Sequence, residues 1–422
     1  MLIFEKSVYG INIAFNKTDN SQKRDFPYMK KILCKGFSFS GVVSGLKKNN
    51  QKDLGLIYSE VPTSIAGVFT KNRVQAAPVL LDRERIKKGF CRAVIVNSGS
   101  ANCCTGDQGL KDAISEAKLA AYGLNISEEL VFVASTGVIG KPLALDKIEA
   151  AVPALVKALS PGGINDFAQA IMTTDTVPKI VSRNGNIGGS GFNITGVAKG
   201  AGMICPDMAT MLCFVCTDAE ASPGYLKEAL LSSVEKSFNR ITIDGDTSTN
   251  DTVLVMANGV SGTVVGSRAD KTYFKELLGE VLMELAKMVV KDGEGATKLV
   301  DIIVKGAASG SEAEKIAKTI ANSSLVKTAL FGEDANWGRI LAAAGRSGVE
   351  FDPGLADIYF NDVLMVKNGM GCGDAAEIEA TKVLKNPEFT IMVDLKMGEG
   401  KASVLTCDFS IDYVKINADY RS

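Results

Sequence analysis

The residue in this sequence best placed for covalent chemistry is a threonine that follows a run of small residues. Residues 199–218 read KGAGMICPDMATMLCFVCTD, and Thr210 stands just before an apolar run. Pro206 disfavours helix at the residue before it, so a tight turn is expected to lead into a buried strand over residues 211–216. If the Thr210 hydroxyl attacks the carbonyl of Ala209, the peptide becomes an ester that water can cleave. The freed α-amine, with an ordinary pKa of about 7.7–8.0, can then serve as base for the hydroxyl of the same residue.

On the residues alone, a threonine that opens a buried strand is more often purely structural. The absence of histidine from the chain bears on this choice. It excludes serine–histidine and cysteine–histidine nucleophiles, histidine-ligated zinc and HExxH helices. Any nucleophilic catalysis must therefore use another base, and a freed N-terminal amine is one.

Other polar residues stand where strands are expected to end. Thr136 and Gly137 follow an expected strand over residues 130–134 and could offer a hydroxyl and a backbone N–H to a developing oxyanion, although the residues alone favour an ordinary turn. The hydroxyls and carboxylate of residues 173–176 suit either an amino-acid site or a capped turn. Lys199 could hold a carboxylate, or it could be a solvated surface lysine.

Residues 199–212 resemble the self-cleavage motif of the ornithine acetyltransferase family, also called ArgJ or glutamate N-acetyltransferase. That motif runs close to KGSGMIAPNMATML, and the cut falls between its alanine and threonine, here Ala209 and Thr210. The resemblance continues through several blocks over residues 35–422. Asp207 stands where asparagine is usual, and its charge is expected to change the rate of cleavage rather than to abolish it.

The resemblance implies a site. Thr210 is the nucleophile, and Thr136 and Gly137, in the block STGVIG, form the oxyanion hole. Glu294 falls where the family binds the substrate amine, and a carboxylate suits an ammonium group. The substrate-binding set implied by the resemblance is Thr173, Lys199, Thr210, Glu294, Asn417 and Ser422.

The reaction implied by the resemblance is a ping-pong transfer in arginine biosynthesis. Acetyl moves from N2-acetylornithine to Thr210 and then to glutamate. No metal or other cofactor is expected, and acetyl-CoA is a possible second acetyl donor. The small-molecule substrates and the chain's own two fragments are the expected partners.

The resemblance also implies a fold and its division. We expect an α/β protein that is ArgJ/DmpA-like, with mixed sheets, flanking helices and two interlocked fragments that share the core. The expected parts are an extension of low structure over residues 1–34, an α fragment over 35–209 and a β fragment over 210–422. The expected assembly is an α2β2 heterotetramer.

Composition excludes several other classes of protein. The 422 residues are 46% hydrophobic and 23% charged, with a net charge of −1, so a nucleic-acid partner is not expected. No apolar run reaches the roughly 18 residues of a membrane-spanning helix. The odd number of cysteines, with no export signal, favours reduced thiols and a cytoplasmic location.

Two rival functions stay open from the sequence. An N-terminal-threonine aminopeptidase or amidase would use the same nucleophile but pass the acyl group to water. An uncleaved binding protein would keep Thr210 as a structural residue.

Periodicity predicts the elements that position these residues. The expected strands include residues 54–59, 66–70, 93–97, 211–216, 253–257 and 302–306. The expected helices include residues 108–122, 145–159, 223–238, 273–290 and one capped by Ser311. Beyond residue 345 mostly strands are expected.

Overall fold

The structure is a computed structural model that describes residues 33–205 and 211–419. Almost all of the expected extension, residues 1–34, lies outside the described residues, as do Ala209, Thr210 and Ser422. The boundaries of the expected parts therefore remain predictions.

The first sheet runs in the order β4-β3-β2-β9-β7-β6-β5, and β1 pairs with β2 beside this path. The β3–β4 and β7–β9 pairs are parallel, and the other pairs are antiparallel. Its strands are β1 (Phe37–Val42), β2 (Leu54–Phe69), β3 (Phe90–Ser100), β4 (Val131–Val138), β5 (Lys179–Ile187), β6 (Ser190–Lys199), β7 (Leu212–Thr217) and β9 (Thr252–Ala257).

The strand order interleaves the two sides of the expected cleavage site. Strands β7 and β9 follow residue 210 in the chain, yet they lie between β2 and β6, which precede it. The β2–β9 and β6–β7 ladders therefore each join a segment before the Ala209–Thr210 bond to a segment after it. This arrangement confirms the prediction of an α/β fold with mixed sheets and a core shared by the two segments.

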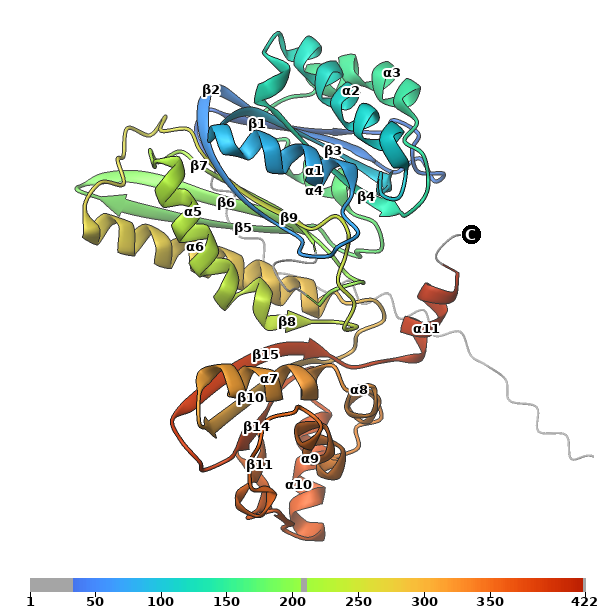
Figure 1. Ribbon diagram of the computed structural model, residues 1–422, viewed down its shortest axis with the longest axis vertical. Coiled ribbons are helices and arrows are strands. Elements are labelled where there is room, and N and C mark those ends of the chain that lie inside the picture. Colours follow the sequence, from blue (N-terminus) through green and yellow to red (C-terminus); the bar gives the residue numbers. More distant parts are fainter. Residues whose placement is uncertain (1–32, 206–210, 420–422) are drawn as a thin grey trace, which may run out of the picture. The chain divides into compact units, whose positions relative to one another are not determined.

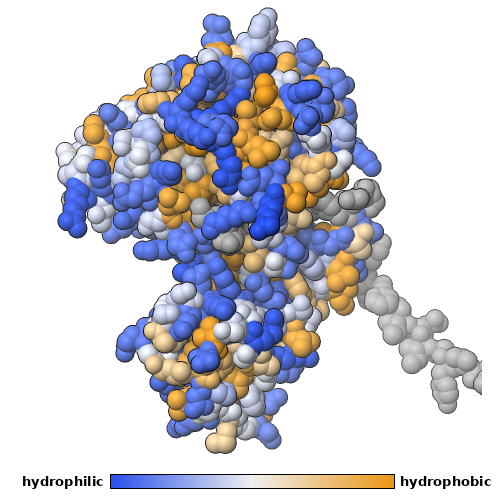
Figure 2. Space-filling model, in the orientation of Figure 1, coloured by the Kyte–Doolittle hydropathy of each residue, from blue (hydrophilic) through white to orange (hydrophobic). Residues whose placement is uncertain are grey.

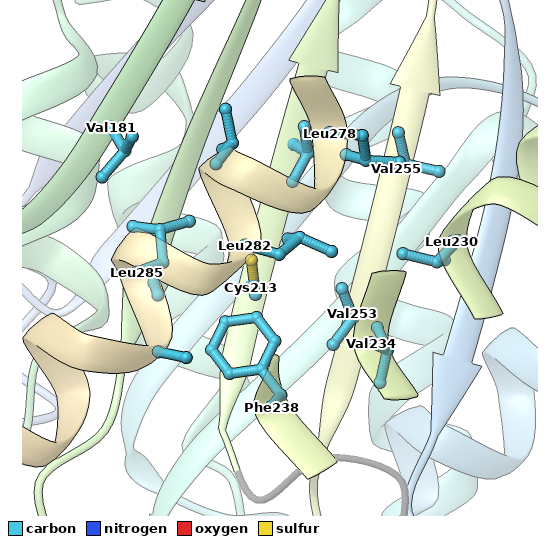
Figure 3. Close-up of a cluster of buried hydrophobic side chains, with 14 of the residues drawn as sticks. Val181, Cys213, Leu230, Val234, Phe238, Val253, Val255, Leu278, Leu282 and Leu285 are labelled. Atoms are coloured by element: carbon cyan, nitrogen blue, oxygen red, sulfur yellow. The ribbon is translucent and has the colours of Figure 1, made fainter. Parts of the chain in front are cut away.

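Side chains of β7 alternate between two layers of helices, as the period of a strand requires. Cys213 packs on one face against α5 and α6, in the cluster that Figure 3 shows with Phe238 and Leu282. Phe214 packs on the other face, with its ring centroid 5.7 Å from that of Phe167 in α4. Cys216 also lies on that second face, so the CxxC thiols point apart. The helices around this sheet are α1 (Ala77–Arg85), α2 (Gly106–Leu124), α3 (Leu145–Lys157), α4 (Ile164–Ile171), α5 (Pro223–Lys236) and α6 (Arg268–Lys291).

The second sheet runs in the order β13-β12-β11-β14-β10-β15-β8. Helix α7 packs on β10 and β15, and α8, α9 and α10 complete the layer around the same core (Figure 1). Its strands are β8 (Ile241–Thr242), β10 (Leu299–Ala307), β11 (Asp357–Phe360), β12 (Val363–Lys367), β13 (Met370–Gly371), β14 (Glu388–Asp394) and β15 (Gly400–Cys407). The remaining helices are α7 (Gly310–Ala321), α8 (Ser324–Phe331), α9 (Trp337–Gly345), α10 (Asp374–Leu384) and α11 (Ile411–Ala418).

Some expected elements were wrong. Residues 54–59 and 66–70 form one strand, β2, rather than two strands separated by a turn. Its register against β3 shifts between Tyr58 and Thr63, and this irregularity accommodates Pro62, which has no N–H for the ladder. Helix α7 is capped by Ser309, whose hydroxyl accepts the Glu312 N–H at 3.2 Å, rather than by Ser311. Beyond residue 345 the expected strands are present as β11, β14 and β15, but helices α10 and α11 of the same region were not predicted.

Among the described residues, no helix is both long enough and apolar enough to cross a membrane. On the face drawn in Figure 2, hydrophilic and hydrophobic residues are interspersed.

Candidate active site

A pocket of about 240 Å³ gathers all the predicted site residues that the structure describes. They come from separate parts of the chain, in β4, at the end of β6, in two loops and in α11. The predicted residues in its wall are Thr136, Gly137, Thr173, Lys199, Glu294 and Asn417. Thr210, Ala209 and Ser422 lie outside the described residues. The six described residues of the predicted site therefore lie around one pocket.

Thr136 and Gly137 lie in the last part of β4, not in a loop after the strand as expected. They pair with Ser98 and Gly99 of the parallel strand β3. Gly137 has φ of +131°, and a Cβ there would lie 2.6 Å from the carbonyl carbon of Gly99. Only glycine fits this close approach of two backbones. The β3–β4 pairing therefore places the Thr136 hydroxyl and the neighbouring backbone at the pocket wall.

Lys199 ends β6 and brings a cation to the pocket. Its residue is only 9% exposed, and its backbone pairs with Leu212 of β7. Its ammonium group makes no hydrogen bond within residues 33–205 and 211–419. A buried ammonium that donates to no other described residue is suited to a ligand carboxylate.

Glu294 brings an anion to the same pocket. It lies in the loop after α6, and its backbone N–H donates to the Ala201 carbonyl at 2.8 Å. Its carboxylate lies directly against Gly202, where a Cβ would approach Oε2 to 2.4 Å. Asn417 Nδ2 donates to Oε2 at 2.8 Å, and Oε1 accepts no hydrogen bond from another described residue. Among the described residues no donor occupies this second oxygen, which suits a ligand ammonium.

Asn417 is carried by α11, a helix that the sequence analysis did not predict. The Ser410 hydroxyl caps the helix by accepting the Tyr413 N–H at 3.3 Å. Tyr413 stacks on Phe409 with ring centroids 4.7 Å apart. The buried Lys327 also lies over the Phe409 ring, with Nζ 4.8 Å from its centroid. The cap and the stack hold the first turn of α11 in place and thereby position the helix that carries Asn417.

A buried network of charges holds three pocket segments together. Lys179 Nζ lies 2.7 Å from Asp175 Oδ1 and 2.6 Å from Asp292 Oδ2, and all three side chains are almost fully buried. Asp175 also accepts the N–H groups of Thr173 at 3.0 Å and of Gly200 at 2.7 Å. Asp292 stands two residues before Glu294. The network thus links the segments that carry Thr173, Lys199 and Glu294.

The pKa shifts in this network favour the charged forms. Burial acts to raise the pKa of Asp175, but the ammonium groups of Lys179 and Lys199 outweigh it and hold that pKa well below its usual range. Burial acts to lower the pKa of Lys179, and Asp175 and Asp292 together raise it above its ordinary value instead. Both groups are therefore ionised at neutral pH.

The pocket also contains residues outside the predicted oxyanion and substrate-binding set. They lie beside the predicted residues or in the loop before β9. These additional lining residues are Val138, Ile139, Thr174, Gly202, Met203, Ser248, Thr249 and Asn250. The signal that could have found the last three is a run of short polar side chains, TSTND, immediately before a buried strand.

Comparison with known proteins assigns the chain to a family. The sequence profile of the ArgJ family matches residues 38–422. The chain belongs to the ArgJ family. It is an enzyme of that family, which confirms the resemblance seen in its motifs. Almost the whole chain takes part in the match, so the pocket lies entirely within the ArgJ region.

Individual ArgJ relatives are similar over nearly their full length. The arginine biosynthesis bifunctional protein ArgJ of Geobacter sulfurreducens is 53% identical over 390 residues, which are 92% of this chain and 99% of that protein. The protein of the same name from Desulfotalea psychrophila is 54% identical over 391 residues, again 92% and 99%. The ornithine acetyltransferase of Mycobacterium tuberculosis, solved with ornithine, is 41% identical over 42% of this chain and 94% of that chain, with a TM-score of 0.40. At that score the assignment to the family rests on sequence.

Replacing Lys179 tests the charge network. In Lys179→Met two buried carboxylates lose their shared cation, and we expect the free energy of unfolding at pH 7 to fall by about 3–5 kcal/mol, measured by denaturant titration. Asp175 with its lowered pKa stabilises the fold above the unfolded pKa of about 3.9 and ceases to do so as pH falls. The difference between the two proteins should therefore shrink in acid.

Lys382→Met is the matched control for this prediction. Lys382 pairs with Glu379 on the surface of α10, where the side chains are 62% and 56% exposed. An exposed pair of this kind contributes about 0–1 kcal/mol. Equal losses in the two variants would contradict the role given to the buried network.

Proposed function

We propose that this ArgJ enzyme is a self-cleaving acetyltransferase that moves acetyl from N2-acetylornithine to glutamate in arginine biosynthesis. The observation that carries the proposal is the pocket, which combines the Thr136–Gly137 stretch with a cation on Lys199 and an anion on Glu294. A hydroxyl and N–H suit an oxyanion, a cation suits a substrate carboxylate, and an anion suits a substrate ammonium. Membership of the ArgJ family supports the same reaction.

The proposed first half-reaction forms an acyl-enzyme. The Thr210 hydroxyl attacks the acetyl carbonyl of N2-acetylornithine and gives its proton to the Thr210 α-amine. Thr136 and Gly137 stabilise the negative oxygen of the tetrahedral intermediate. The C–N bond then breaks, the proton passes to the leaving nitrogen, and ornithine departs from an acetyl ester on Thr210.

The proposed second half-reaction reverses these steps with glutamate. Its amine attacks the ester carbonyl, the Thr210 oxygen leaves and is reprotonated, and N-acetylglutamate is released. Because the acetyl group never meets free water in this cycle, the enzyme is a transferase and not a hydrolase. No metal or other cofactor takes part in the proposal, and acetyl-CoA is a second acetyl donor in it, in keeping with the word bifunctional in the relatives' names.

The proposal includes the cleavage that creates the nucleophile. Cleavage at Ala209–Thr210 gives fragments 1–209 and 210–422, assembled as an α2β2 heterotetramer in the cytoplasm. The interleaved order of β2, β9, β7 and β6 supports a product whose two fragments stay joined through one sheet.

Mass measurement and a substitution at Thr210 test this proposal together. Under denaturing conditions the wild-type protein should give the masses of residues 1–209 and 210–422. Thr210→Ala should give one uncut chain and no acetyl transfer, because both reactions need the same hydroxyl. Thr319→Ala, in α7 and outside the pocket lining, is the control and should be cut and active. An uncut wild type, or an active Thr210→Ala, would contradict the proposal, and acetate release without glutamate would favour the aminopeptidase or amidase alternative.

A second substitution tests the proposed role of Glu294. In Gly202→Ala the new Cβ would displace the Glu294 carboxylate from its place against the backbone. Loss of one charge-assisted hydrogen bond to substrate should raise the KM for N2-acetylornithine roughly 10-fold, measured per cleaved chain. Gly224→Ala is the control, since a Cβ there meets open space. An unchanged KM in Gly202→Ala would remove Glu294 from the substrate site.

A further inference from the structure

The amide nitrogen and the amide oxygen of the Asn250 side chain are both hydrogen-bonded at the pocket wall. It lies in the loop just before β9 and is 7% exposed. Its Nδ2 donates to the Ala101 carbonyl at 2.6 Å and to the Ser135 carbonyl at 2.8 Å. Its Oδ1 accepts the Thr249 hydroxyl at 2.6 Å. Both protons of the amide are therefore given to backbone carbonyls from two different segments.

The orientation of this amide follows from its partners. Two carbonyl oxygens can only accept, so the end of the side chain that faces them must be the donor nitrogen. A carboxylate of the same shape would face both carbonyls with oxygen and could satisfy neither. Asparagine is thus the residue whose chemistry this position requires.

Its two partners bracket the stretch that holds the proposed oxyanion hole. Ser135 directly precedes Thr136, and its carbonyl is bound by Asn250. Ala101, whose carbonyl Asn250 also binds, donates its own N–H to the Val138 carbonyl at 3.1 Å. One side chain therefore restrains both ends of the four residues from Ser135 to Val138.

This restraint crosses the expected cleavage site. Asn250 belongs to the segment after residue 210, while Ala101 and Ser135 belong to the segment before it. After cleavage, the same hydrogen bonds would still fix the oxyanion stretch relative to β9. Strand β9 is paired in parallel with β7, which begins two residues after Thr210. Asn250 therefore restrains the oxyanion stretch relative to the strand that follows the nucleophile.

We propose that Asn250 is a positioning residue for acetyl transfer, which holds Thr136 and Gly137 where the oxyanion develops. This inference rests on the proposed function and adds to it a residue that acts through the backbone of Ser135 and Ala101. It binds no substrate group in this role. Its effect should appear in the chemical step and not in substrate affinity.

Steady-state kinetics of Asn250→Asp test the inference. We expect kcat for acetyl transfer, per cleaved chain counted by mass, to fall about 100-fold, as small misplacements near a reacting centre do. The KM for N2-acetylornithine should stay within about threefold, since a group that acts only in the transition state leaves KM largely unchanged. In a double variant with Thr136→Val, the loss should be smaller than the product of the two single losses, because both substitutions damage one oxyanion stretch.

Asn258→Asp is the matched control. Asn258 stands at the other end of β9, is 9% exposed and donates to the Lys35 carbonyl at 2.8 Å. Its variant should keep the wild-type kcat. Asn250→Ala, which removes the donors without adding a charge, is measured in parallel in case the aspartate variant does not fold.

The outcomes distinguish a failure of the role given to Asn250 from a failure of the proposed function. An active wild type with an unchanged kcat in Asn250→Asp, or with multiplicative losses in the double variant, would overturn the role of Asn250 alone. The same conclusion follows if neither Asn250 variant folds, or if both fold and remain uncut, because Asn250 then acts on folding or cleavage. A cleaved wild type without any acetyl transfer would overturn the proposed function, and the role of Asn250 with it.

Discussion

The site depends on the buried ion network formed by Asp175, Lys179 and Asp292. Burying an ion costs its hydration free energy, so buried ions are tolerated only when they are paired and hydrogen-bonded. Here both carboxylates also accept hydrogen bonds from backbone N–H groups or a hydroxyl. The additional bonds of Asp175 tie in the segments of Thr173 and Gly200, and Asp292, paired with Lys179, stands two residues before Glu294. The loop before β5, the loop after β6 and the loop after α6 are thereby held around one pocket.

The ion network also joins the two sides of the proposed cleavage site. Asp175 and Lys179 lie before residue 210 and Asp292 lies after it, so the buried Lys179–Asp292 ion pair crosses the proposed cut. The hydrophobic contacts do the same, since β9 and β7 are inserted between β2 and β6. Breaking the Ala209–Thr210 bond would therefore leave the two fragments held together by non-covalent contacts in the core and around the pocket.

Much of the architecture follows from local sequence patterns. Short apolar runs correctly placed β3, β7 and β9, and Ser222 with Pro223 correctly placed the start of α5. The start of α6 was placed too late, although Ser267 and Asp270 form a capping box that reads directly from the sequence. The continuity of β2 through Pro62 was not predicted, because a shift in strand register gives no local signal.

The site was predictable as a set of residues but not as a geometry. Motif resemblance selected Thr136, Lys199 and Glu294, and the structure places them in one pocket. The partnership of Lys179 with Asp292 spans 113 residues, and no local pattern specifies which distant carboxylate meets a buried lysine. Asn250 was missed for a similar reason, since its importance lies in two backbone carbonyls from other segments.

The central claim is that Thr210 carries the acetyl group between the two substrates, and trapping that intermediate tests it most directly. The protein is incubated with N2-acetylornithine alone, quenched in acid, and the masses of its fragments are measured. The account predicts that the fragment 210–422 becomes heavier by one acetyl group on Thr210, and that adding glutamate before the quench removes it. Acetyl transfer to glutamate with no acetyl group on Thr210 at any time would contradict the account.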